Sequence, residues 1–77
     1  MYTFKNGNLT SLDQNFKYIL RYFNFDFWNT EDGFKIHLFD KNYVANDQVD
    51  CIIEFYGKTI FITVKNAIDW INEYIKE

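Results

Sequence analysis

The sequence has little of several residues that usually help to classify a protein. Cysteine occurs once, at Cys51, proline is absent, and glycine occurs three times in 77 residues. A single cysteine cannot form a disulfide within the chain, so we expect a protein of a reducing compartment, the cytoplasm. The apolar runs are far shorter than the ~20 residues that cross a membrane, and the chain does not begin with a signal-peptide pattern. We therefore expect no membrane partner.

Positive charge is also scarce. The chain has 11 acidic and 8 basic residues and a net charge of −3, and no basic stripe runs along it. This balance disfavours binding to nucleic-acid backbones. Arginine occurs once, at Arg21, whereas residues with AT-rich codons such as Phe, Tyr, Asn, Lys and Ile are frequent. Such a composition indicates a low-GC bacterium, or one of its phages or mobile elements, as the source.

The groups that carry catalysis or bind metals are few and isolated. His37 is the only histidine and has no second ligand at a recognised metal-binding spacing. Cys51 has no nearby histidine or lysine that would activate its thiol, and it falls in a segment predicted to face the core. Phosphate-binding glycine loops and Cys-x-x-Cys or His-Glu-x-x-His motifs are absent. We therefore expect no metal, no cofactor and no enzymatic activity.

Aromatic residues, in contrast, are abundant, at 22% of the chain. Residues 1–77 are long enough for one compact domain, which at this size buries only about 60% of the surface of its unfolded chain. Each aromatic ring can bury about 150–250 Å². We therefore expect some of the rings to lie at the surface or in an interface.

Local patterns in the first half predict a helix followed by a hairpin. Thr10 or Ser11 can cap a helix over residues 12–22, where apolar residues recur at helical spacing. From residue 23 onwards apolar and polar residues alternate, which is typical of a strand, and the polar turn 29–33 ends in a glycine. Residues 34–39 alternate again and form the predicted return strand. A short strand is also predicted at residues 2–5, and residues 40–47 form a polar connection.

Residues 51–64 predict a second hairpin. A type II′ turn at Gly57-Lys58 would pair Phe55 with Ile60 and Glu54 with Phe61. One face of this hairpin would then be wholly apolar. The other would mix apolar and polar side chains.

A helix capped by Asn66 completes the prediction, since an apolar stripe follows it towards the C-terminus. The predicted fold is therefore α+β, a two-layer sandwich. An antiparallel sheet of three to four strands carries the N-terminal and C-terminal helices on one face, because both helical stripes need burial.

The other sheet face is the predicted contact surface. It combines large rings with charged groups, as interface centres do. The predicted binding residues are Trp28, Phe39, Ile52, Glu54, Tyr56 and Phe61. Coverage of this face by the chain itself, and stacking of nucleic-acid bases or a small ligand on it, are the alternatives.

The function that this surface favours is non-enzymatic binding of another protein or of a second copy of the chain. Small acidic α+β proteins of this kind are common among inhibitors, immunity proteins and counter-defence proteins of phages and mobile elements, which is an analogy of size and charge. We therefore expect an inhibitor or modulator of a partner protein.

Overall fold

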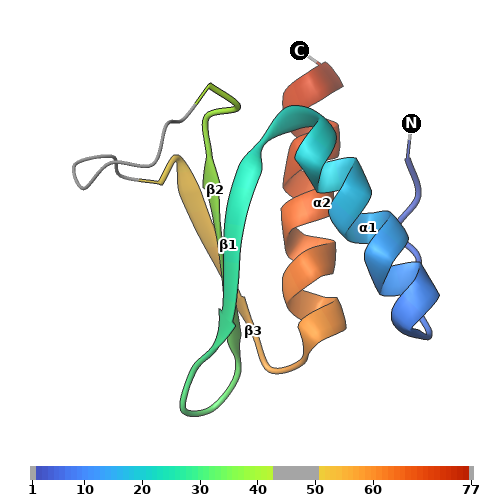
Figure 1. The fold of residues 1–77 in the computed structure, drawn as a ribbon, viewed down its shortest axis with the longest axis vertical. Helices are drawn as coiled ribbons and strands as arrows, with labels where there is room; N and C mark the ends of the chain where they lie inside the picture. The colour runs from blue at the N-terminus through green and yellow to red at the C-terminus, as the bar shows by residue number, and fades with distance from the viewer. Residues whose placement is uncertain (1, 43–50, 77) are drawn as a thin grey trace.

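The computed structural model describes residues 2–42 and 51–76, which form two layers, a sheet and a pair of helices. The elements in chain order are α1 (Leu9–Tyr22), β1 (Asn24–Asn29), β2 (Phe34–Phe39), β3 (Ile53–Gly57) and α2 (Ile60–Lys76). The strands form an antiparallel sheet in the order β1-β2-β3, and both helices lie on the same side of it (Figure 1). The predicted α+β fold with an N-terminal and a C-terminal helix is confirmed. The described part of the sheet has three strands, and most of the predicted 40–47 connection lies outside the described residues.

Helix α1 begins earlier than its sequence predicts. Asn8 is the N-cap, and its side-chain oxygen accepts a hydrogen bond of 3.0 Å from the backbone N–H of Ser11. Asparagine is as good an N-cap as serine, so this cap replaces those expected at Thr10 and Ser11. The helix ends where the N–H of Phe23 donates to the carbonyl of Ile19 at 2.9 Å.

The hairpin of β1 and β2 follows the prediction from alternation. Phe25 pairs with Leu38 and Phe27 with Ile36, and the turn closes where the Thr30 N–H donates to the Gly33 carbonyl at 2.7 Å. The rings of Phe25 and Phe27 lie 5.1 and 5.5 Å from the Phe16 ring of α1. These aromatic contacts attach the edge strand to the helical layer.

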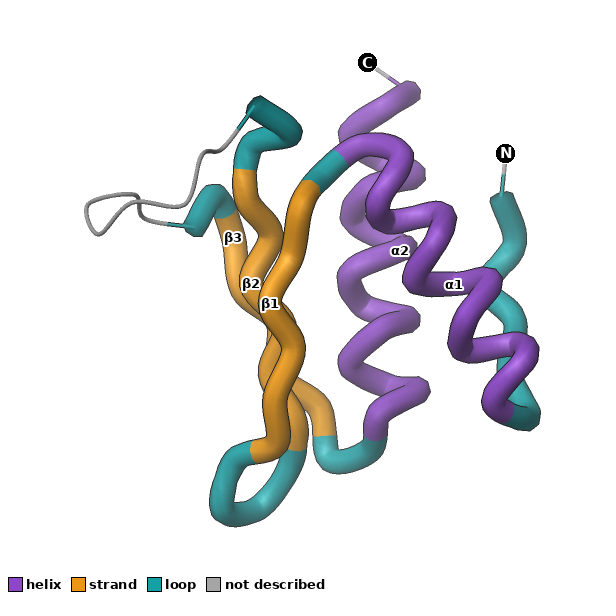
Figure 2. Tube along the Cα trace, in the orientation of Figure 1, coloured by secondary structure: helices purple, strands orange, loops and turns teal. Residues whose placement is uncertain are grey.

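The predicted second hairpin is wrong in its second half. Residues 60–76 form the single helix α2, and the chain turns from β3 directly into it (Figure 2). A type II′ turn needs positive φ at its first central residue, and Gly7 is the only described residue with positive φ, so Gly57 does not make this turn. The Thr59 hydroxyl instead accepts from the Ile62 N–H at 3.1 Å and caps α2, so the helix starts before Asn66.

Packing explains why a helix replaces a strand in this β-branched segment. Along α2 the buried residues are Thr63, Val64, Ala67, Ile68 and Ile71, which lie on one helical face. A strand over the same residues would have buried Ile62 with Val64, yet Ile62 is 49% exposed. The gain from burying a helical stripe of this length outweighs the modest strand preference of Ile, Thr and Val.

The core lies between the sheet and the two helices. Its fully buried centre comprises Ile36 and Leu38 of β2, Ile19 of α1 and the buried face of α2. Around it pack half-buried rings and aliphatic side chains from β1, β3 and the helices. Cys51 is only half-buried, which differs from its predicted place in the core.

The N-terminal segment forms no strand, but it is tied to both helices. Asn15, fully buried on α1, accepts hydrogen bonds from the Tyr2 hydroxyl (2.7 Å) and the Lys5 N–H (2.9 Å) and donates to the Lys5 carbonyl (2.6 Å). The Tyr18 hydroxyl donates to Asn72 of α2 at 2.6 Å, and Asn72 donates to the Tyr2 carbonyl at 3.1 Å. These bonds satisfy the polar groups that the segment buries.

Candidate functional site

The sheet has one face that neither helix covers, called the open face below. Because side chains alternate along a strand, it is formed by the residues between those that contact the helices. These are Asn24, Asp26 and Trp28 of β1, Lys35, His37 and Phe39 of β2, and Glu54 and Tyr56 of β3. The face lies opposite the helical layer in Figure 1.

The strand register arranges this face in rows. His37 on the central strand has Asp26 opposite it on β1 and Glu54 opposite it on β3. In the neighbouring row Lys35 lies between Trp28 and Tyr56. The central strand therefore supplies the ammonium of Lys35 and the imidazole of His37, and the outer strands supply carboxylates and aromatic rings on both sides.

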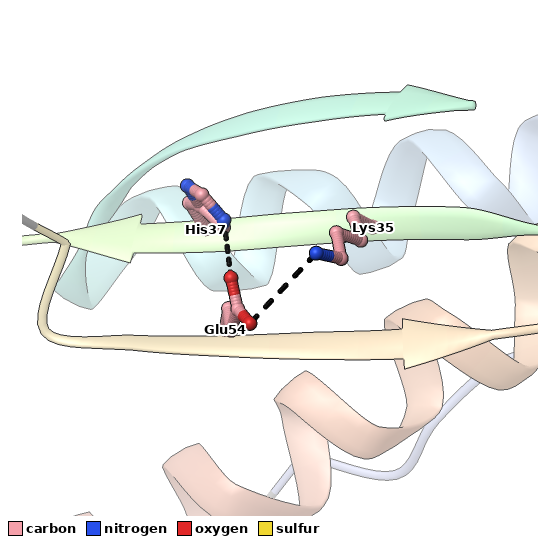
Figure 3. Close-up of polar contacts among 3 residues, drawn as sticks. All are labelled: Lys35, His37 and Glu54. Atoms are coloured by element: carbon pink, nitrogen blue, oxygen red, sulfur yellow. Dashed lines mark hydrogen bonds and ion pairs between the residues drawn. The ribbon is translucent and has the colours of Figure 1, made fainter. Parts of the chain in front are cut away.

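Polar contacts hold the central row in place. His37 Nε2 lies 2.7 Å from Glu54 Oε2, and the Lys35 ammonium lies 3.9 Å from the other Glu54 oxygen (Figure 3). The Glu54 side chain is 52% exposed, so solvent screens both contacts and neither adds much to stability. Their effect is to orient the carboxylate across β2 and β3.

Aromatic contacts orient the rings around His37. The Trp28 ring packs edge-to-face on the imidazole, with centroids 4.6 Å apart and planes at 83°. The Phe39 ring lies on the other side of His37 at 6.3 Å. Trp28 remains 39% exposed, so one part of its indole is fixed and the rest faces solvent.

Tyr56 is fixed by the β1–β2 turn. Its hydroxyl donates to the Asp32 backbone carbonyl at 3.1 Å. The glycine at position 33 makes this approach feasible, since a Cβ there would lie 2.7 Å from the Tyr56 ring. Loss of hydration and the nearby Asp32 carboxylate raise the pKa of the Tyr56 hydroxyl above its ordinary value. Tyr56 nevertheless remains 41% exposed.

The structure brings together most of the predicted binding residues. Trp28, Glu54 and Tyr56 lie on the open face, and Ile52 immediately precedes β3, where its N–H donates to the Leu38 carbonyl at 2.7 Å. Ile52 is exposed. Phe39 belongs to the same face by alternation, but its side chain is only 8% exposed and offers little contact area.

Phe61 is not part of the open face, so its predicted place opposite Glu54 is wrong. It lies in the first turn of α2, and its ring contacts that of Phe4 edge-to-face at 6.2 Å. The misplacement follows from the wrong hairpin register. The sequence does not predict the contact of Tyr56 with the Asp32 carbonyl, because no local pattern shows which side chain from β3 reaches that turn.

The open face presents aromatic rings, carboxylates and hydrogen-bonding groups. His37 and Glu54 form a hydrogen-bonded pair, but across residues 2–42 and 51–76 no hydroxyl or thiol nucleophile lies in hydrogen-bond reach of the imidazole. Within the same residues, no group of three His, Cys, Asp or Glu side chains is arranged to hold a metal ion. No helix in the described part of the chain is long and apolar enough to span a bilayer.

A shallow cavity of about 280 Å³ lies elsewhere, on the helical layer. It is lined by Tyr2, Gln14, Lys17, Tyr18 and Arg21. The two tyrosine rings stack at 4.3 Å, and their hydroxyls are already bonded to Asn15 and Asn72. Burial raises the pKa of both hydroxyls. The two tyrosines that line this cavity therefore serve to attach the N-terminal segment to the helices.

Comparison of the chain with protein-family models, with curated proteins and with solved structures found no match.

Proposed function

We propose that the protein is a small non-enzymatic binding domain whose open face contacts another protein. The observation that carries the proposal is the pair of half-exposed rings, Trp28 and Tyr56, each held in one orientation by its neighbours. Rings fixed before binding lose little side-chain entropy on association. Large aromatic side chains surrounded by polar groups are also typical of the energetic centre of protein interfaces.

Inhibition or modulation of the partner is the mode of action that we propose. A small domain with one open sheet face acts most simply by covering a surface of a larger protein. The composition agrees with an origin in a low-GC bacterium, a phage or a mobile element, where small acidic inhibitors are common. We also propose a cytoplasmic location, because Cys51 has no cysteine partner in the chain with which to form a disulfide.

A nucleic-acid or small-ligand binder is the second candidate. Exposed rings on a sheet are the surface on which unpaired bases stack in several RNA-binding folds. The carboxylates of Asp26 and Glu54 next to the rings would repel a phosphate backbone, so we rank this function below protein binding.

The test compares three baits in affinity captures from a lysate of the source organism. One bait is the wild type, and a second carries Trp28→Ala with Tyr56→Ala. A matched control bait carries Leu9→Ala with Ile62→Ala, which removes two exposed apolar side chains from the helical layer. We expect a protein that the wild type and the control retain and the open-face variant loses. Retention by all three baits, or capture of nucleic acid alone, would contradict the proposal.

A further inference from the structure

Charge is divided unequally between the two layers of the molecule. The sheet layer, residues 24–42 and 51–57, has five acids and two lysines, a net charge of −3 with histidine neutral. The helical layer, residues 2–23 and 58–76, has six bases and three acids, a net charge of +3. One of the two sheet-layer lysines, Lys41, donates to the Leu20 carbonyl of α1 and so is directed at the helices.

The acids of the helical layer are paired within it. Lysines lie 3.0 Å from Asp13, 2.6 Å from Asp69 and 3.7 Å from Glu73, each within four residues along the helix. Their charges are therefore largely balanced locally.

The acids of the sheet layer are paired less completely. Glu54 shares His37 and Lys35, whereas Asp26, Glu31 and Asp32 form no ion pair with any residue that the structure describes. Asp26 lies on the open face, and Glu31 and Asp32 lie in the turn beside Trp28 and Tyr56. Within the described residues, the exposed rings are thus bordered by carboxylates that form no ion pair.

We infer that the occupant of the open face is a cationic protein surface, with arginine or lysine side chains beside apolar ones. This inference rests on the proposed function and adds the chemistry of the partner. A guanidinium stacks on a tryptophan or tyrosine face and binds a carboxylate through two parallel N–H groups, so Trp28 and Asp26, two residues apart on the same face of β1, match one such group. A second copy of the chain docked face to face would bring two acidic faces together, and a nucleic acid would add phosphates, so like charges oppose both.

The direct test uses the full chain and two synthetic peptides followed by NMR. One peptide alternates arginine with leucine, and the other alternates glutamate with leucine. We expect the arginine peptide alone to shift the Trp28 indole signal and the amides of β1 and β3 in a saturable manner. No saturable shift with the arginine peptide, shifts centred on α1 and α2, or an equal response to the glutamate peptide would overturn the inference.

Two triple variants separate the local effect from the net charge. The sheet variant carries Asp26→Asn, Glu31→Gln and Asp32→Asn, and the helix variant carries Asp13→Asn, Asp69→Asn and Glu73→Gln. Both change the net charge of the chain by the same amount. We expect the sheet variant to bind the arginine peptide about tenfold more weakly, and the helix variant to stay within about twofold of wild type. Equal losses in the two variants would mean unspecific attraction and would overturn the inference.

The same variants distinguish failure of this inference from failure of the proposed function. If the captured protein is lost by the Trp28 and Tyr56 alanine variant but binds the sheet variant as tightly as wild type, the open face binds a protein that is not cationic. In that case the inference fails and the function stands. If the alanine variant retains the captured protein, the function itself fails. A dimer in light scattering, or a poly-dT oligonucleotide that shifts the open-face signals more than the arginine peptide does, would also overturn the inference.

Discussion

The two faces of the same three strands differ in what their side chains contact. On β2, Ile36 and Leu38 are fully buried against the helices, whereas their sequence neighbours Lys35 and His37 contact Glu54 on the other face. One face is held by burial and the other by directional contacts that leave its rings half exposed. Successive side chains of a strand point to opposite faces of the sheet. One set of residues can therefore stabilise the fold while the alternate set is available for the proposed binding.

The largest expected effect is on the covered face. Ile36→Ala removes a fully buried side chain, so we expect the free energy of unfolding to fall by about 2–5 kcal/mol, measured by denaturant titration. The matched substitution on the open face is His37→Ala at the next position of β2, which should cost less than half as much. Equal losses at the two positions would mean that the open face is also part of the core.

A smaller effect is expected where the sheet meets α2. A Cβ on Gly57 would lie 2.6 Å from the Thr63 hydroxyl and 2.8 Å from its backbone nitrogen, so Gly57→Ala must displace the start of the helix. We expect a loss of about 1–3 kcal/mol, as for other overpacked sites. Lys58→Ala, at the exposed neighbouring residue, serves as the control. An unchanged melting temperature for Gly57→Ala would contradict the tight junction of β3 and α2.

The sequence predicts the fold correctly where a local pattern fits only one type of secondary structure. Phe25 and Phe27 alternate with polar residues and lead into a polar turn, so periodicity and turn chemistry both indicate a hairpin. Ile60, Ile62 and Val64 fit a strand equally well, but Ile60 and Val64 also begin a helical stripe that continues to Ile71. The choice depends on packing against β2 and α1, which the local sequence does not show.

The sequence predicts the candidate site correctly only on the strands that it also predicts correctly. Trp28, Glu54 and Tyr56 follow from alternation within β1 and β3, whose predicted positions are confirmed. Phe61 was misplaced because its position depended on the wrong hairpin register. The burial of Phe39 depends on tertiary packing and has no signal in the sequence.

Alkaline pH should affect Tyr2 and Tyr18, the two stacked tyrosines of the helical layer. Burial raises the pKa of Tyr2 and Tyr18 above the usual value of about 10, so the folded state keeps these protons to higher pH than the unfolded state does. Their contribution to stability is complete below pH ~10 and is lost as pH rises through the raised pKa values. We expect denaturant midpoints to fall above that pH, and to fall less steeply in Tyr18→Phe than in wild type. An equal slope in the two proteins would contradict this assignment.

The smallest expected effect on stability is at the centre of the open face. His37→Gln removes a half-exposed contact with Glu54, and we expect the free energy of unfolding to change by less than about 1 kcal/mol. Cys51→Ser should be similarly mild and should leave partner binding intact. Both are checked by thermal melts and binding titrations. Loss of partner binding in a folded Cys51→Ser protein would point to chemistry at the thiol and contradict the non-enzymatic function.

The most direct test of the binding face is cross-saturation NMR on the complex with the captured partner protein. Saturation applied to the partner attenuates signals of this chain only where the two proteins touch. The account predicts attenuation at the Trp28 indole, the Tyr56 ring and the Ile52 methyl groups, with Leu9 and Ile62 on the helical layer unaffected. Attenuation centred on Leu9 and Ile62, with Trp28 and Tyr56 unchanged, would contradict it.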